Sequence, residues 1–159
     1  MCCIAPPFTA SEDFAIDKPA GMKCPNITAD FRCAIHAELK IEGYRGCTVY
    51  ECYGAGQKVT QVTFQGRNWR DNPELAHKIF SVFMKMRIIH ELLMYLNEAG
   101  KLDLPQLLAA GVQKKFDELE QLSLQEADEV IKIDVTLHKR EVDDLINQVG
   151  EIVRNKRLA

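Results

Sequence analysis

The sequence lacks the features that attach a protein to a membrane or to nucleic acid. It contains no apolar run approaching the roughly 20 residues that a membrane-spanning helix needs. Its start, MCCIAPPFTASEDF, has no basic segment followed by a long apolar one and does not resemble a secretory signal. Lysine and arginine form no dense cluster and the net charge is -3, which argues against binding to a phosphate backbone. We therefore expect a cytoplasmic protein without a membrane or nucleic-acid partner.

Cysteine is absent from residues 53–159, although six cysteines precede them. These six are Cys2, Cys3, Cys24, Cys33, Cys47 and Cys52. Cytoplasmic thiols stay reduced, so we do not expect a disulfide framework. Cysteines that serve as small hydrophobic residues would scatter through the core instead. Their clustering predicts a shared chemical role in the first third of the chain.

Residues 1–56 are punctuated by prolines and glycines, which predicts an irregular segment. Within it we expect one short helix over residues 30–42, capped by Asp30. The run KVTQVTF, residues 58–64, contains β-branched residues and predicts a short strand or extended arm. The lone Trp69 is expected to cover the junction between the cysteine-bearing head and the helical body.

Helical periodicity begins at residue 71, where Asp71 or Asn72 can cap a helix and Pro73 suits its first turn. Gly100 is expected to end this helix, and Pro105 to begin the next. SLQE, residues 123–126, matches a capping box for a last helix that runs to about residue 157. IKIDVTL, residues 131–137, alternates in polarity and contains β-branched residues, which predicts a break or a kink in that helix.

Three helices with short connections fold most simply as an antiparallel bundle. The predicted fold is therefore mainly α, with a loop-rich cysteine head packed on an antiparallel three-helix bundle. We assign residues 1–70 to the head and residues 71–159 to the bundle. The 3-4 spacing of apolar residues in the last helix also allows a homodimer.

The cysteines predict a metal site, because four thiolates in a tetrahedral arrangement hold zinc or an iron–sulfur cluster. Cys47 and Cys52 are close enough in sequence to ligate from one turn, and Cys24 and Cys33 flank the expected helix start. His36 follows Cys33 by one helical turn and is either a further ligand or a histidine packed at the junction.

Two other interpretations of the cysteines stay open. They could be reduced, buried and inert, or one of them could act in redox chemistry or catalysis. No C-x-x-C motif is present, so the thioredoxin-like signature is missing. A thiol enzyme would use Cys47 or Cys52 as nucleophile, but no base or orienting carboxylate is evident. HELLM, residues 90–94, lacks the second histidine of a zinc-protease helix. We therefore predict no catalytic residue.

The run CPNITADFRCAIHAELKIEGYRGCTVYEC resembles the zinc- or iron-chelating cysteine-cluster family often called YkgJ-like. That family carries a CC element, a CP element, a C-x-I-Y/H element and a closing C-x4-C. The corresponding residues here are Cys2-Cys3, Cys24-Pro25, Cys33 to His36, and Cys47 to Cys52. DFAIDKPAG, DFRCAIH, GCTVYECYGAGQKVTQVTF and GRNWR are also similar to the head region of bacterial pentapeptide-repeat-type proteins. The resemblance spans residues 2 to about 98 and implies metal binding.

The chain departs from these families in two ways. Family members usually carry one or two further cysteines upstream of CC, and this sequence begins at Met1. The pentapeptide ladder itself is absent, so no task that depends on it is inferred. The sequence thus predicts a non-enzymatic protein that binds a zinc ion or an iron–sulfur cluster. The alternative is a helical interaction module, with an unknown protein partner or a second copy, whose cysteine head is purely structural.

Overall fold

The computed structural model describes residues 1–158, and this part of the chain is mainly helical, as predicted. Its α-helices are α1 (Arg45–Val49), α2 (Ala55–Gln57), α3 (Ala76–Gly100), α4 (Gln106–Ser123), α5 (Ala127–Lys132) and α6 (Val135–Leu158). Three further short turns of helix are η1 (His36–Glu38), η2 (Lys58–Thr63) and η3 (Pro73–Leu75). Within residues 1–158, extended pairing is limited to two isolated bridges, Phe8 with Lys18 and Ile27 with Cys33. No helix in this range has the length and apolar character needed to cross a membrane.

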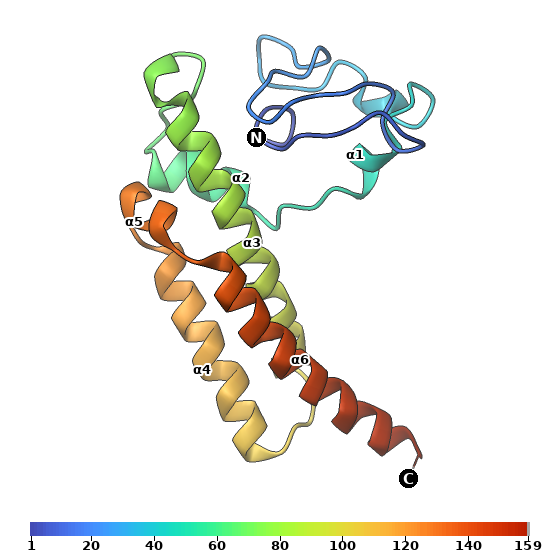
Figure 1. The fold of residues 1–159 in the computed structure, drawn as a ribbon, viewed down its shortest axis with the longest axis vertical. Coiled ribbons are helices and arrows are strands. Elements are labelled where there is room, and N and C mark those ends of the chain that lie inside the picture. Colours follow the sequence, from blue (N-terminus) through green and yellow to red (C-terminus); the bar gives the residue numbers. More distant parts are fainter. Residues whose placement is uncertain (159) are drawn as a thin grey trace.

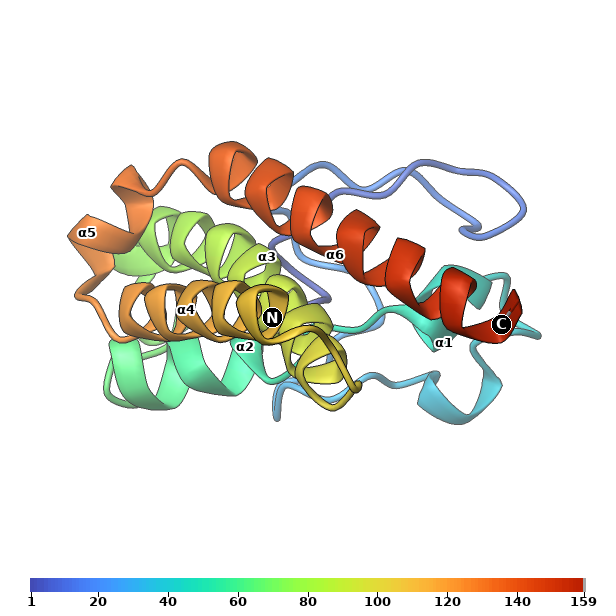
Figure 2. The same cartoon turned by 90° about the horizontal axis from the view of Figure 1, so that it is seen from below.

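The three long helices lie side by side and alternate in direction along the chain (Figures 1 and 2). Helix α3 packs against both α4 and α6, and α4 also contacts α6. Residues that are almost fully buried form the core between them: Ile79, Val82, Phe83, Met86, Ile89, Leu96, Leu119, Val130 and Val142. These residues recur at three- and four-residue steps in α3, which is why that helix can face the others along its length.

The end of α3 and the start of α4 lie where the sequence predicts them, whereas α3 begins at Ala76, later than the predicted start at residue 71. Pro73 is the first residue of η3, which leads into α3, and α3 ends at Gly100. Helix α4 begins directly after Pro105, because proline has no amide hydrogen to donate and suits a helix start. No side-chain cap is present at Asn72, so the predicted capping by this residue is not observed.

The predicted break in the last helix is confirmed, but the predicted capping box is wrong. Ser123 is the last residue of α4, and its hydroxyl donates to the carbonyl of Glu120 instead of accepting from the amide of a following residue. The helical conformation is interrupted between Lys132, where α5 ends, and Val135, where α6 begins. There Asp134 Oδ1 accepts from the amides of Thr136 and Leu137 at 3.0 and 3.2 Å, which begins α6.

Lys58–Thr63 form a π-helical turn, so the strand or extended arm predicted over residues 58–64 is wrong. The amide of Phe64 donates to the carbonyl of Val59 at 2.9 Å, five residues back. Ala55, Val59 and Phe64 are buried in the same core as α3. Packing against α3 thus overrides the β-branched composition of this run. The hydrophobic core therefore crosses the boundary proposed at residue 70.

The predicted helix over residues 30–42 is reduced to the three residues of η1. Phe31 has a φ of 65°, a left-handed conformation that a helix cannot continue through. Asp30 caps no helix; its carboxylate accepts from the Thr28 hydroxyl and pairs with Arg32 at 3.4 Å. The amide of Arg32 donates to the same hydroxyl at 3.1 Å. This segment is therefore a closed turn.

Trp69 lies at the junction between the cysteine-bearing segment and α3, as predicted. Its ring is 5.9 Å from that of Phe31 and 6.4 Å from that of Phe80 on α3. The neighbouring Arg70 donates to the carbonyls of Ala29 and Thr28. These contacts hold the loop between Cys24 and Cys33 against the helices.

Candidate functional site: a cavity lined by thiols

Short backbone contacts within the first 50 residues bring distant cysteines together. The amide of Cys24 donates to the carbonyl of Cys3 at 2.8 Å. Two antiparallel bonds between Phe8 and Lys18, of 2.8 and 2.9 Å, close the loop between these cysteines. The bridge between Ile27 and Cys33 turns the chain back a second time. The irregular backbone that prolines and glycines impose thus brings Cys3, Cys24 and Cys33 together, whereas Cys47 lies in the short helix α1.

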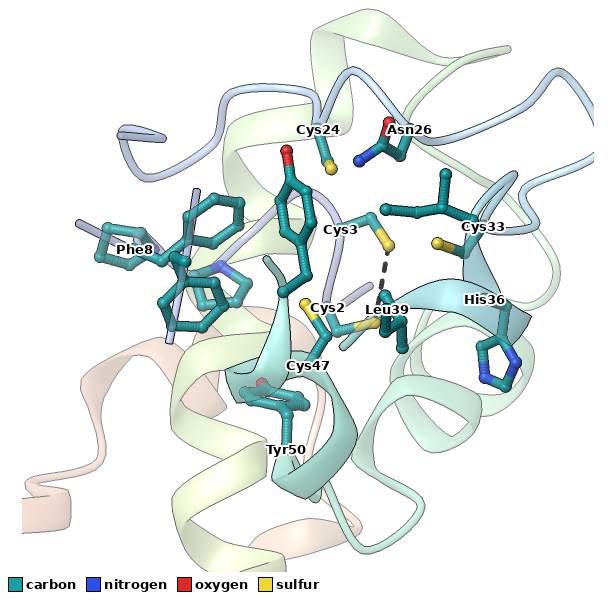
Figure 3. A pocket seen from close by; sticks show the side chains of 15 residues that line it. Cys2, Cys3, Phe8, Cys24, Asn26, Cys33, His36, Leu39, Cys47 and Tyr50 are labelled. Atoms are coloured by element: carbon teal, nitrogen blue, oxygen red, sulfur yellow. Dashed lines mark hydrogen bonds between the residues drawn. The ribbon is translucent and has the colours of Figure 1, made fainter. Parts of the chain in front are cut away.

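Five of the six cysteines line one cavity of about 270 Å³ (Figure 3). They are Cys2, Cys3, Cys24, Cys33 and Cys47. Figure 3 shows their sulfur atoms facing a shared space. The walls are largely apolar and include the stacked rings of Phe8 and Phe14, whose centroids are 4.5 Å apart. Thiols directed into an apolar cavity are a suitable donor set for a soft metal.

Cys2 and Cys3 form the one thiol–thiol hydrogen bond among residues 1–158. Cys2 Sγ and Cys3 Sγ are 3.8 Å apart. No group of three cysteine sulfur atoms in this range lies within 4.8 Å of one another. The five thiols therefore surround the cavity instead of converging on one point.

The surroundings of the cavity lower the pKa of one thiol and raise the pKa of two others. A hydrogen bond from Cys3, with help from the positively charged N-terminus, lowers the pKa of Cys2 to about 6. The same bond and burial raise the pKa of Cys3. Burial also raises the pKa of Cys47. At neutral pH the cavity thus holds a thiolate at Cys2 beside the protonated thiols of Cys3 and Cys47, and a metal that binds these two must displace their protons.

Cys52 and His36 differ from the other residues predicted for the site. Cys52 does not line the cavity; its side chain packs against the hydrophobic core of the helices. His36 borders the cavity, but it is exposed and its ring points away from the sulfur atoms in Figure 3. The structure therefore brings together five of the seven residues predicted as ligands.

Tyr50 is a cavity residue that the sequence did not single out. Its hydroxyl is buried and has no hydrogen-bond partner among residues 1–158. Burial raises the pKa of Tyr50 to about 12, so the phenol stays protonated and able to donate. Buried hydroxyls are almost always bonded, so a partner for this one is needed. A run such as CTVYEC gives no signal by which this could have been foreseen.

Lys18 is a second residue that the sequence did not single out. Only 3% of its surface is exposed, which is rare for lysine. Its ammonium donates to the carbonyls of Ile4, Met22 and Pro19 at 2.9, 3.0 and 3.2 Å. Burial lowers the pKa of Lys18, while the nearby thiols of Cys24, Cys3 and Cys2 act in the opposite direction. A lysine in a Pro- and Gly-rich loop is normally exposed to solvent, so the sequence gives no sign that Lys18 is buried.

A separate group of ionisable side chains joins α4 to α6. Ligand atoms of Glu118, His138 and Glu141 lie within 4.8 Å of one another. The ammonium of the buried Lys115 donates to Glu118 at 3.1 Å, to His138 Nδ1 at 2.9 Å, and to Glu141. The ammonium of Lys115 thus occupies the position that a metal ion would take, and the group is an ion network between the two helices.

Comparison with known proteins identifies a relative but no activity. No family model matches the chain, and no solved structure matches it. The chain is 39% identical over 154 residues to "Uncharacterized protein YybG" of Bacillus subtilis (strain 168). The match covers 97% of this chain and 55% of that protein. The chain therefore spans about half the length of the relative that it matches.

Proposed function

We propose that the protein binds a metal centre, an iron–sulfur cluster or zinc, through the thiols that line the cavity. The observation that carries this proposal is the gathering of Cys2, Cys3, Cys24, Cys33 and Cys47 around one apolar space. Five neighbouring thiols without a metal are open to oxidation and to unwanted disulfides. Metal binding explains why cysteine is confined to this part of the chain. The reduced thiols that it requires fit a cytoplasmic location.

The spacing of the sulfur atoms favours an iron–sulfur cluster over a single zinc ion. Tetrahedral zinc with Zn–S bonds of about 2.3 Å holds its sulfur ligands about 3.8 Å apart. The sulfur atoms of Cys2 and Cys3 meet that spacing at 3.8 Å, but no three thiols in residues 1–158 lie within 4.8 Å of one another. A cluster shares its thiolates among several iron atoms, so it accepts ligands that stand further apart. Zinc would require the cavity to contract.

The proposed role is non-enzymatic, with the helices serving as the support of the metal head. A thiol enzyme needs an activated nucleophile beside a base. Burial raises the pKa of Cys47, and Cys52 faces the helical core, so neither is a suitable nucleophile. The homodimer and the unknown protein partner expected from the sequence stay predictions.

The test is the metal content of the protein after anaerobic purification, together with its absorbance spectrum. Iron and sulfide with visible absorbance support the cluster, and zinc in a colourless protein supports the alternative. A folded protein with neither metal would refute the proposal.

Two cysteine variants make this test specific to the cavity. Cys24→Ser removes a thiol that lines it, and we expect the metal content to fall several-fold. Cys52→Ser is the matched control, because this thiol lies outside the cavity. Equal loss of metal in both variants would show that the site is not the cavity described here.

A further inference from the structure

The buried ammonium of Lys18 has no counter-charge among the carboxylates of residues 1–158. No aspartate or glutamate in this range forms a salt bridge with it. All three of its hydrogen bonds go to neutral backbone carbonyls. Removing an ion from water is costly unless it is paired with an opposite charge. The ammonium also lies 5.2 Å from the centroid of the Phe8 ring, and this contact and the carbonyls offset part of the cost without supplying a negative charge.

The surroundings of Lys18 indicate which groups supply the opposite charge. Its acceptor Ile4 directly follows Cys3 in the chain, and its acceptor Met22 precedes Cys24 by two residues. Cys3 and Cys24 are themselves joined by a backbone hydrogen bond of 2.8 Å. The ammonium thus lies against the two segments that carry cavity thiols.

Metal binding changes the charge of those thiols. Each cysteine that ligates does so as a thiolate, so a centre held by several cysteines carries net negative charge on its ligands. An apolar cavity stabilises such charge poorly. A fixed cation next to the cavity lowers this cost, and the bound centre in turn offsets the cost of burying the cation.

We propose that Lys18 is the counter-charge of the metal site: its ammonium stabilises the thiolates of Cys2, Cys3 and Cys24 when they bind metal. This inference rests on the proposed function. It makes Lys18 a positioning and charge-tuning residue and not a ligand. If Lys18 served only to tie three carbonyls together, a neutral donor at this position would preserve the metal affinity.

The test compares Co²⁺ binding to the metal-free chain and to three Lys18 variants, read from the thiolate-to-cobalt charge-transfer absorbance. Lys18→Arg keeps the charge. Lys18→Gln removes the charge but keeps an amide that can donate to the carbonyls. Lys18→Met removes both. Circular dichroism at the same temperature selects variants that remain folded.

We expect Lys18→Gln and Lys18→Met to bind Co²⁺ about ten- to a hundredfold more weakly than the parent, the effect of one nearby charge at an effective dielectric constant of about 20. Lys18→Arg should stay within a few-fold of the parent. If Lys18→Met does not fold, the comparison of Gln with Arg decides the question.

Two results with the variants would overturn the role of Lys18. One is parental affinity in Lys18→Gln, which would assign any effect of Lys18→Met to the lost hydrogen bonds. The other is equal loss in Gln and Arg, which would indicate a disturbed structure. A parent chain that binds no Co²⁺ would also remove it. The proposed function is decided separately, by the metal content of the anaerobically purified protein.

Discussion

Gly46→Ala tests the packing of the cavity wall beside Cys47, because a methyl group at this position collides with Phe14. A Cβ on Gly46 would lie 2.7 Å from Phe14 Cε2 and 3.0 Å from Cε1, and closer still to Cζ. Carbon atoms in contact prefer about 3.5–4.0 Å, so the ring must move by about 1 Å. The ring is stacked on Phe8 at a centroid distance of 4.5 Å, and both rings line the cavity.

Two effects on the free energy of unfolding compete in this variant. Alanine is favoured over glycine in a helix by about 1 kcal/mol, and Gly46 lies in α1. That gain is smaller here because α1 has only five residues. Overpacking costs about 1–3 kcal/mol, and disturbing an aromatic pair costs about 0.5–1.5 kcal/mol more. We expect a net destabilisation of about 1–3 kcal/mol.

The assay is urea unfolding of the metal-free protein, followed by circular dichroism and tryptophan fluorescence. Gly150→Ala in α6 is the matched control, since no heavy atom outside its own helix lies within 4 Å of its added Cβ. We expect this control to be neutral or stabilised by up to about 1 kcal/mol. In a Phe14→Ala background, Gly46→Ala should lose its destabilising effect, because the collision is gone. An unchanged or raised stability of Gly46→Ala alone would refute the reasoning.

The remaining predictions concern the thiols, the phenol and the core. At pH 7 iodoacetamide should modify Cys2 before the other cysteines of the metal-free protein, and the rate of this modification should fall below pH 6. Cys3→Ser should slow the modification of Cys2. Peptide mass spectrometry measures both effects, and preferential modification of another cysteine would contradict the prediction. The pKa of Tyr50 is raised from its usual 10.0 to about 12, so the stability that its neutral phenol contributes is full below pH 10 and is lost between pH 10 and 12. Tyr50→Phe should reduce this alkaline loss in denaturant unfolding, and an unchanged pH profile would argue against a buried phenol. Phe83→Ala in the core should cost about 3–5 kcal/mol, whereas Leu107→Ala, with Leu107 87% exposed, should stay within about 0.5 kcal/mol. Similar costs for the two would contradict the assigned core.

Much of the helical body could be predicted from the sequence because its signals are local. Gly100, Pro105 and the alternating run at residues 131–137 act on the backbone within one or two turns, so their effects do not depend on distant residues. The observed end of α3, the start of α4 and the break before α6 agree with these predictions. The capping box predicted from SLQE was wrong, because α4 continues through Ser123 and the Ser123 hydroxyl donates to the carbonyl of Glu120 in the preceding turn.

The sequence predicts that the candidate site is made of cysteines, but not which of the cysteines share the cavity. The confinement of six cysteines to residues 2–52 is visible in the sequence and predicts shared chemistry there. Which thiols share a space depends on loop contacts between residues far apart, such as the bond from Cys24 to Cys3. Sequence spacing alone suggested Cys47 and Cys52 as a pair, whereas the structure turns Cys52 toward the helical core.

The sequence by itself thus determined the helical class, the main helix ends and the location of the thiols, because these follow from backbone preferences and composition. Only the tertiary structure decided that Lys58–Thr63 form a π-helical turn, since Val59 and the following Phe64 gain burial by packing with α3. It also decided that Lys18 is buried next to the thiols. Burial is a property of the whole packed chain, and no local pattern reports it.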